Sequence, residues 1–196
     1  QTCRQIAEWR AEGLETPAVS VNLSSLHFRN LKLPADIATL LSEYDLPPET
    51  LTIEITESVM MDDRPETLQV IAALRTLGVG LSMDDFGTGF SSLSSLARLP
   101  VSELKIDRSF IHDLENDPRA HAIATAVIRI GQSLGLTVVA EGVETEAQHR
   151  LLSELDCDVA QGYLFGVPMP ASEIRQWILD RRNNPPAAPR PNQLAS

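Results

Sequence analysis

Two aspartates, Asp84 and Asp85, stand side by side at the end of an apolar run, and a segment rich in glycine and serine follows them. Two ionised carboxylates about 4 Å apart repel each other by roughly 4 kcal/mol at an effective dielectric constant near 20. Solvation on an open surface, a shared proton or a bound divalent cation can offset this repulsion. The other polar residues of the chain bear on which of the three applies.

Comparable polar residues occur where other β-rich apolar runs end, namely Asn22, Glu54, Lys105, Glu141 and Gln161. Asn22, Glu54 and Glu141, together with the two aspartates, offer one amide oxygen and four carboxylates, which suit Mg²⁺ or Mn²⁺ better than zinc. One of the adjacent aspartates could bridge two ions while the other binds the second ion. A two-metal site of this kind activates water and stabilises in-line phosphoryl displacement. Lys105 could orient that water or neutralise charge in the transition state.

Each of these residues also has a structural interpretation when it is considered alone. The aspartate pair could cap a helix or lie in a solvated turn, and Glu54 with Glu57 could form a solvated strand face. Asn22 could stabilise a local turn, and Gln161 could be a hydrogen-bonded amide in the core. The metal site is favoured because these residues recur at the same end of successive strands.

Lys105 has two further interpretations. It could pair with Asp107 on the surface, or it could form a Schiff base inside a barrel, as in an aldolase. Carboxylates gathered around the lysine would raise its pKa, which disfavours Schiff-base chemistry.

The composition limits the class of protein. The chain has 196 residues with 43% hydrophobic content and a net charge of −11, which suits one globular domain and argues against binding of polymeric nucleic acid. The longest apolar runs are interrupted by polar residues and glycines, so we expect no membrane span. The polar N-terminal segment lacks a signal-peptide pattern, and only Cys3 and Cys157 are present, so we expect a reducing cytoplasmic setting.

Apolar β-rich runs alternate with helical patterns along the chain. Strands are predicted at 18–24, 51–58, 79–85, 102–107, 136–142 and 158–165. Helices are predicted at 2–12, 34–44, 64–77, 91–98, 118–134, 145–155 and 171–182. The start signals for helices are Pro34, Pro65, Pro118 and Thr145, and the stop signals are Gly78 and Gly135.

Repeated βα units predict a parallel sheet, either doubly wound or closed as a barrel. In a barrel the C-terminal strand ends converge on one mouth, whereas in an open sheet the outer ends lie too far apart to act together. Glu54 alternates with Ile53 and Ile55 along its strand. Lys105 alternates with Leu104 in the same way, so the polar face is expected to point to the barrel axis. We therefore predict an α/β fold of the (βα)8 TIM type, incomplete here with about six βα units.

The predicted units are fewer than a complete barrel needs. A barrel has eight strands, and two missing units correspond to on the order of 60 residues. We therefore expect the chain to begin partway through its domain. We expect this domain to occupy residues 1–182, and we expect residues 183–196, which are rich in Pro and Ala, to form a disordered tail.

Six short motifs follow one another along the chain. They are VNLS (21–24), EITES (54–58), DDFGTGFSSL (84–93), LKID (104–107), AEGVE (140–144) and QGYLFGVPMP (161–170). In this order and spacing they resemble the motifs of the EAL-domain cyclic di-GMP phosphodiesterases of bacteria. The resemblance covers nearly the whole chain, from the first helix to about residue 182, and six ordered motifs make it specific.

The resemblance implies a modified (βα)8 barrel with one strand reversed. It also implies hydrolysis of cyclic di-GMP to linear pGpG with two Mg²⁺ or Mn²⁺ ions. The metal ligands that it implies by position are Asn22, Glu54, Asp84, Asp85 and Glu141, with Asp84 as the bridging residue. Lys105 is similar to the family residue that holds the attacking water, and Glu141 has also been considered as a base.

The resemblance further implies a substrate-binding set, which consists of Asp107, Gln161, Tyr163, Phe165 and Pro168. The first two resemble polar residues at the substrate and metal site of the family. The last three resemble the segment that lies beside a guanine base.

Four more residues are implied to support the site. Glu57 resembles the glutamate that anchors the glycine-rich loop of the family, and Gly87 and Gly89 permit that loop to move. Glu144 resembles a further carboxylate that is structural or lies on the ligand side.

One segment departs from the family pattern. The E-A-L segment, with its glutamate ligand and a nearby arginine, precedes the first helix in the family and is absent here. We therefore expect this piece alone to lack one ligand and two strands. The resemblance implies a homodimer and covalently attached sensory or cyclase domains. It also implies a bacterial cytoplasmic location, alone or as the cytoplasmic domain of a larger membrane protein. The alternative is a non-catalytic cyclic di-GMP receptor or regulatory interaction domain.

Overall fold

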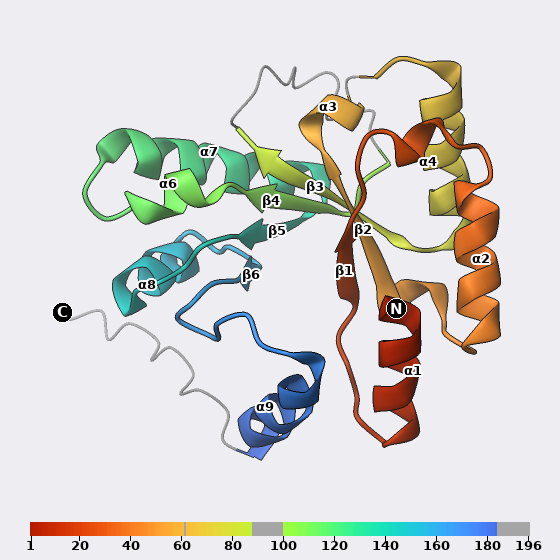
Figure 1. Cartoon of the computed structure of the whole chain (residues 1–196). Helices are drawn as coiled ribbons and strands as arrows, with labels where there is room; N and C mark the ends of the chain where they lie inside the picture. The colour runs from red at the N-terminus through yellow and green to blue at the C-terminus, as the bar shows by residue number, and fades with distance from the viewer. Residues whose placement is uncertain (61, 88–99, 184–196) are drawn as a thin grey trace. The chain divides into compact units, whose positions relative to one another are not determined.

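The computed structural model describes residues 1–60, 62–87 and 100–183 (Figure 1). The chain divides into two compact units, Gln1–Gly166 and Val167–Ser196. The predicted helix at 91–98 and the predicted tail, apart from Asn183, lie outside the described residues.

The first unit alternates strands and helices. Its strands are β1 (Val19–Asn22), β2 (Leu51–Thr56), β3 (Gly80–Phe86), β4 (Glu103–Ile106), β5 (Thr137–Ala140) and β6 (Val159–Ala160). Its α-helices are α1 (Thr2–Ala11), α2 (Leu33–Glu43), α3 (Glu57–Met60), α4 (Pro65–Leu77), α6 (Arg108–His112), α7 (Pro118–Leu134) and α8 (Glu146–Glu154). The described part of this unit also contains two short 3₁₀ helices, η1 (His27–Arg29) and η2 (Pro48–Thr50).

All six strands form one parallel sheet in the consecutive order β1-β2-β3-β4-β5-β6. A doubly wound sheet reverses its strand order at a switch point, whereas a barrel keeps strands in chain order. The sheet is curled and the helices connect its strands (Figure 1). The prediction of an incomplete TIM-type barrel is therefore confirmed.

The predicted helix signals act as expected. Pro118 is the first residue of α7, where its missing N–H costs no hydrogen bond. Gly78 and Gly135 end α4 and α7 in the left-handed conformation, with φ of 95° and 69°. Thr145 caps α8 in a reciprocal capping box with Gln148.

Five of the six predicted strands are shorter in the structure, and two of them have an evident reason. The strand predicted at 51–58 ends at Thr56, because Glu57 begins helix α3. The strand predicted at 158–165 is reduced to Val159–Ala160. After it, Gly162 passes so close to the β5–α8 connection that a Cβ atom there would lie 2.3 Å from the backbone N and O of Val143. Only glycine permits this approach, which keeps the chain after β6 against the end of β5.

Apolar side chains hold the strands that carry the polar residues. Ile55, Leu104 and Ile106 are fully buried in the hydrophobic core that β2 and β4 share with the helices. Their burial fixes which strand residues face the other way, because neighbouring residues of a strand point to opposite faces. Glu54 and Lys105 alternate with these residues and therefore lie on the inner face of the curled sheet.

The second unit contains helix α9 (Ala171–Asn183). Within this helix the Arg181 guanidinium lies 4.5 Å from the centroid of the Trp177 ring, a distance suited to a cation–π contact. Across the described ranges of both units, no helix combines the length and the apolar character needed to cross a bilayer.

Candidate active site

Polar residues line the C-terminal edge of the sheet. Asn22, the last residue of β1, is in register with Glu54 on β2. Asp84 lies near the end of β3, Lys105 lies on β4, and Glu141 directly follows β5. Because the strands are parallel and neighbouring, these residues lie at one edge, where TIM-barrel enzymes build their active sites.

Lys105 is the centre of a buried ion network. Its Nζ lies 2.7 Å from Glu54 Oε1, 2.5 Å from Glu141 Oε1 and 3.8 Å from Asp84 Oδ1. Lys105 and Glu54 are only 4% and 6% exposed. The ammonium has three N–H donors, and two of them serve the two glutamates. The structure thus brings together residues of β2, β3, β4 and the end of β5.

The electrostatics keep this lysine charged. Burial alone would lower the pKa of Lys105, but hydrogen bonds from its ammonium to Glu141 and Glu54 outweigh burial and raise this pKa. The pKa of Glu141 is raised, chiefly because the carboxyl group is buried, although Lys105 opposes the shift. A protonated lysine cannot attack a carbonyl group, so this network disfavours the Schiff-base interpretation.

Three carboxylates form a compact cluster beside the lysine. Asp84, Asp85 and Glu141 each offer one oxygen, and these atoms all lie within 4.8 Å of one another. Asp85 adopts a left-handed conformation with φ of 57°, and its backbone N–H donates to Asp84 Oδ1 at 3.1 Å. The pKa of Asp85 is raised, first by burial and then by the negative charges of Asp84 and Asp107. These are the properties of oxygen ligands held close together, which is the donor set that divalent cations such as Mg²⁺ take.

The charges at this edge do not balance. Glu54, Asp84, Asp85 and Glu141 contribute four negative charges when ionised, and Lys105 contributes one positive charge, which leaves −4 + 1 = −3. Such an excess in a partly buried site is stabilised by bound cations. The residues present therefore fit a centre for divalent metal ions.

Asp107 caps a helix and does not pair with Lys105. It precedes α6 as its N-cap and accepts hydrogen bonds from Ser109 N at 2.9 Å and Ser109 Oγ at 2.5 Å. Burial alone would raise the pKa of Asp107, but the bonds from Ser109 outweigh it and lower this pKa. The interpretation in which Asp107 pairs with Lys105 on the surface is wrong, because Lys105 is buried and bonded to the glutamates.

Two other structural interpretations are also wrong. Glu54 is not part of a solvated strand face, because its side chain is buried against Lys105. Gln161 is not a core amide, because it is exposed just after β6. Asn22 is exposed as well, at the end of the edge strand β1.

The residues expected to support the glycine-rich loop lie beside the end of β3. Glu57 begins α3, and its Oε2 atom is buried without a hydrogen-bond partner among the described residues. Gly87 has a positive φ of 100°, and a Cβ atom there would approach the Phe110 ring to 3.0 Å. Gly89 lies outside the described residues, so the anchoring of this loop by Glu57 stays a prediction.

The residues expected to contact the substrate are more dispersed. Tyr163 is 64% exposed, and Phe165 makes an edge-on contact with His149, with ring centroids 5.3 Å apart. Pro168 belongs to the second unit. Their role beside a base stays a prediction.

Sequence reasoning missed residues on the outer side of the strand ends. Gln148 is 3% exposed, and its Oε1 accepts hydrogen bonds from the backbone N–H groups of Glu144 and Thr145. Its Nε2 donates to the backbone oxygen of His112 at 3.3 Å and so joins α8 to α6. The sequence T-E-A-Q (145–148) is a capping-box signal that could have pointed to Gln148. Arg108, which lines the same region, carries no comparable signal.

The fold and the site together define a TIM-type barrel protein with an acidic, metal-suited centre at the C-terminal strand ends. The family model for the EAL domain matches residues 1–168. The chain therefore belongs to the EAL domain family.

Relatives of this chain include an oxygen sensor protein and a bifunctional cyclase and phosphodiesterase. The oxygen sensor protein DosP of Escherichia coli is 51% identical over 178 residues, which is 91% of this chain and 22% of DosP. The bifunctional diguanylate cyclase/cyclic di-GMP phosphodiesterase MucR of Pseudomonas aeruginosa is 45% identical over 174 residues, 89% of this chain and 25% of MucR. The chain thus spans about a quarter of the length of these relatives.

Solved structures agree with the fold. The PaMucR phosphodiesterase in complex with c-di-GMP superposes with a TM-score of 0.82 at 46% identity, covering 88% of this chain and 70% of that one. BlrP1 of Klebsiella pneumoniae, in a complex with calcium and cyclic di-GMP, superposes with a TM-score of 0.76 at 29% identity, covering 85% of this chain and 42% of that one. Members of the family thus bind cyclic di-GMP, and one does so together with a divalent cation.

Proposed function

We propose that this chain carries the catalytic centre of a cyclic di-GMP phosphodiesterase that produces linear pGpG. The observation that carries the proposal is the excess of four carboxyl groups over the single ammonium group of Lys105 at the mouth of the sheet. A surface pair or a structural network would have matched charges, whereas this cluster needs added cations.

The residues proposed to hold two ions, Mg²⁺ or Mn²⁺, are Asn22, Glu54, Asp84, Asp85 and Glu141. All of them offer hard oxygen atoms, which suits these cations. When bound, the ions would neutralise charge on the phosphoryl group and lower the pKa of water.

Lys105 is proposed to hold the attacking water. Two of its donors bind Glu54 and Glu141, which fixes the direction of the third donor. This donor can hold the oxygen of a water molecule or stabilise charge on a phosphoryl oxygen. Glu141, whose pKa is raised chiefly by burial, is proposed to accept a proton from that water.

The overall reaction balances with water as the only co-reactant. The water oxygen forms a bond to one phosphorus atom of the cyclic dinucleotide, and the bond from this phosphorus to O3′ breaks. The proton lost by the water is returned to O3′, so the product is linear pGpG with its phosphate on the 5′ side.

Further properties belong to the same proposal. The names of DosP and MucR support covalently attached sensory or cyclase domains, because the chain matches only a quarter of each. We also expect a homodimer and a bacterial cytoplasmic location for the catalytic centre. Gln161, Asp107, Tyr163, Phe165 and Pro168 are proposed to contact the substrate.

The test is to measure pGpG release from cyclic di-GMP by the protein purified in its natural full length, with Mg²⁺, with Mn²⁺ and with a chelator. We expect turnover that requires the metal. Tight binding of cyclic di-GMP without hydrolysis in either metal would contradict the proposal and favour a receptor.

A further inference from the structure

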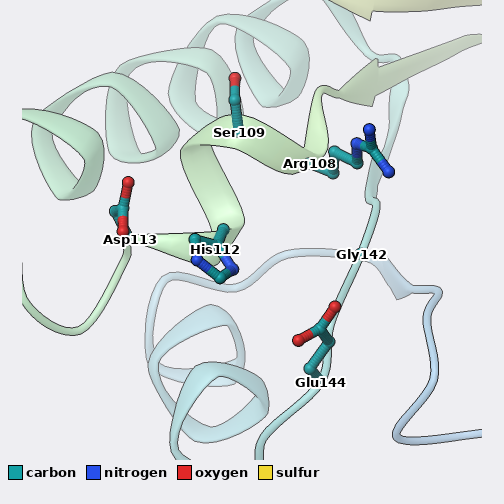
Figure 2. Close-up of a pocket in the computed structure, with 6 residues that line it drawn as sticks. All are labelled: Arg108, Ser109, His112, Asp113, Gly142 and Glu144. Atoms are coloured by element: carbon teal, nitrogen blue, oxygen red, sulfur yellow. The ribbon is translucent and has the colours of Figure 1, made fainter.

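A pocket lies between helix α6 with its following turn and the connection from β5 to α8. Its lining residues are Arg108, Ser109, His112, Asp113, Gly142 and Glu144, drawn in Figure 2. Each wall of the pocket begins directly after a residue of the strand ends, because Arg108 follows Asp107 and Gly142 follows Glu141. A contact that holds the two walls together therefore also bears on the positions of Asp107 and Glu141.

The wall that carries Glu141 is held through its backbone. The N–H of Glu141 donates to the carbonyl oxygen of Ile106 on β4 at 3.2 Å. The N–H of the fully buried Val143 donates to the carbonyl oxygen of Gln161 at 3.0 Å, and the Val143 carbonyl accepts from the N–H of Leu164 at 3.0 Å. These bonds hold the first half of the connection between β4 and the chain after β6.

The second half of the connection is held by one side chain, that of Gln148 on α8. Its Oε1 atom accepts from the backbone N–H groups of Glu144 at 2.7 Å and Thr145 at 3.0 Å. Its Nε2 atom donates to the carbonyl oxygen of His112 at 3.3 Å. His112 is the last residue of α6, where backbone carbonyl groups have no partner within the helix. Gln148 is only 3% exposed, so these three bonds form away from solvent.

A helix cap alone does not account for these bonds. The capping box of α8 consists of the bond from the Thr145 N–H to Gln148 Oε1 and the return bond from the Gln148 N–H to Thr145 Oγ1 at 3.0 Å. The bonds with Glu144 and His112 lie outside this motif. The amide of Gln148 therefore joins the two walls of the pocket in addition to starting the helix.

Helix α6 extends from the acidic centre to Gln148. Asp107 caps its first turn and accepts from the backbone N–H of Ser109 at 2.9 Å. Asp107 also lies close enough to Asp85 for its negative charge to raise the pKa of that residue. Because the other end of α6 is bonded to Gln148, this glutamine joins the segment that carries Asp107 to the segment that carries Glu141.

We propose that Gln148 is a positioning residue for the acidic centre. Its amide fixes the connection after β5 against α6 and so keeps the Glu141 carboxylate 2.5 Å from the Lys105 ammonium. Without the amide, three backbone polar groups lose their buried partner, and the connection shifts to satisfy them. A displacement of about 1 Å at a reacting group can reduce a rate by on the order of 100-fold. This inference rests on the proposed function, in which Glu141 holds metal and accepts a proton.

The first test is Gln148→Met in the full-length protein, because methionine has a similar size but neither the acceptor nor the donor. At saturating Mg²⁺ we expect kcat for cyclic di-GMP to fall by about 10–100-fold. KM should change by less than about threefold, because the lost bonds do not contact the substrate. We expect the affinity for Mn²⁺ without substrate, measured by electron paramagnetic resonance, to fall by about tenfold. Values of kcat and Mn²⁺ affinity within twofold of wild type would overturn the inference.

A second variant, Gln148→Glu, separates the bonds to the two walls. A carboxylate still accepts from the N–H groups of Glu144 and Thr145, but it has no donor for His112. We expect kcat and Mn²⁺ affinity between those of Gln148→Met and wild type, and at least about threefold below wild type. Losses equal to those of Gln148→Met would overturn the role of the bonds to the connection. If Gln148→Met does not fold, values within twofold of wild type in Gln148→Glu would overturn the inference.

The matched control is Thr145→Ala, which removes the hydroxyl group of the capping box but keeps the backbone N–H that binds Gln148. We expect a lower melting temperature, because a helix cap is lost, with kcat and Mn²⁺ affinity within about twofold of wild type. Losses as large as those of Gln148→Met would overturn the inference, since they would follow from weakening α8 alone. The exposed Gln69→Met on α4 is a second control and is expected to change neither quantity.

The Mn²⁺ titration separates this inference from the proposed function, because it requires no turnover. Binding of Mn²⁺ without hydrolysis of cyclic di-GMP in wild type, together with weaker Mn²⁺ binding in Gln148→Met, would overturn the proposed function and support the positioning role. Normal hydrolysis in wild type, with kcat and Mn²⁺ affinity unchanged in Gln148→Met, would overturn the positioning role alone.

Discussion

Two ion-pair clusters of this protein use the same kinds of side chain in opposite settings. In the turn before α4, Asp62 binds Arg64 through Oδ1 and Nε at 2.7 Å and also accepts from Thr67 Oγ1 at 3.0 Å. At the strand ends, Lys105 binds Glu54 at 2.7 Å across 51 residues of sequence. The first pair is local and partly solvated, whereas the second is assembled by the sheet and buried.

The difference lies in charge balance as well as in burial. Asp62 and Arg64 neutralise each other, and their contacts with Thr67 and with the backbone N–H of Arg64 fix the entry to α4. Around Lys105, carboxylates exceed cations by three. A balanced pair therefore indicates a structural role, and an unbalanced buried cluster indicates a site that binds cations.

Replacement of Lys105 by Met should have the largest effect. We expect a loss of activity of about 10³-fold, because the donor for the attacking water is gone. We also expect a loss of about 3–5 kcal/mol of unfolding free energy, because Glu54 is left buried with no counter-charge. The activity is measured by a steady-state assay. The unfolding free energy is measured by denaturant unfolding in the presence of a chelator.

A second substitution checks the cause of that instability. The double variant Lys105→Met/Glu54→Gln should regain part of the lost stability but no activity, because it removes the orphaned charge without restoring the donor. Equal stability of the single and double variants would show that an orphaned charge on Glu54 is not the cause of the instability.

Replacement of Asp85 by Asn should reduce the response to metal. In wild type, Mg²⁺ is expected to raise the melting temperature, since an ion that binds the folded state stabilises it by mass action. In Asp85→Asn we expect most of this increase to be lost. In a chelator we expect unchanged or higher stability, because the repulsion from Asp84 and Asp107 is relieved. The exposed Asp63→Asn is the control, and an undiminished response in Asp85→Asn would contradict the assignment.

Replacement of Glu57 by Ala should have a smaller effect on the same site. We expect metal affinity to fall by about tenfold, a typical cost of removing a residue that supports the ligands, while the barrel stays folded. The measurement is activity as a function of Mg²⁺ concentration, with the exposed Glu66→Ala as control. Equal metal affinity in the Glu57 variant and wild type would contradict the role of Glu57 in supporting the metal ligands.

Replacement of Asp62 by Asn should have the smallest effect. We expect the melting temperature to change by less than about 3 °C, because partly exposed ion pairs contribute little. The Arg64 guanidinium holds the pKa of Asp62 well below its usual value. The stability from this pair is therefore present above the ordinary aspartate pKa and is lost as the pH falls toward the lowered value. Thermal melts between pH 7 and pH 2 compare the variant with wild type, and an equal pH dependence would contradict this origin.

Most elements could be predicted from local sequence. Prolines at helix starts, the left-handed glycines Gly78 and Gly135, and the alternation around Glu54 depend on neighbouring residues alone. The point at which β6 ends could not be predicted, because a tertiary contact determines it. Gly162 meets the backbone of Val143, which is distant in sequence, and no local pattern encodes that meeting.

The residue types of the candidate site could also be read from sequence, but their partners could not. Asp107 looks like a neighbour of Lys105 on the same strand face, yet it caps α6 and is bonded to Ser109. Gln148 looks like an ordinary helix residue, yet it joins two walls of a pocket. These contacts depend on which helices and strands the fold brings next to each other.

The sequence by itself therefore determined the order of strands and helices, the family motifs and the carboxylates available to a metal, because helix caps, strand alternation and residue chemistry are local properties. Only the tertiary structure decided that Lys105 is buried between Glu54 and Glu141, and that Arg108 and Glu144 face one pocket. The physical reason is that burial and charge balance arise when a parallel sheet brings distant segments to one edge and excludes water from between them.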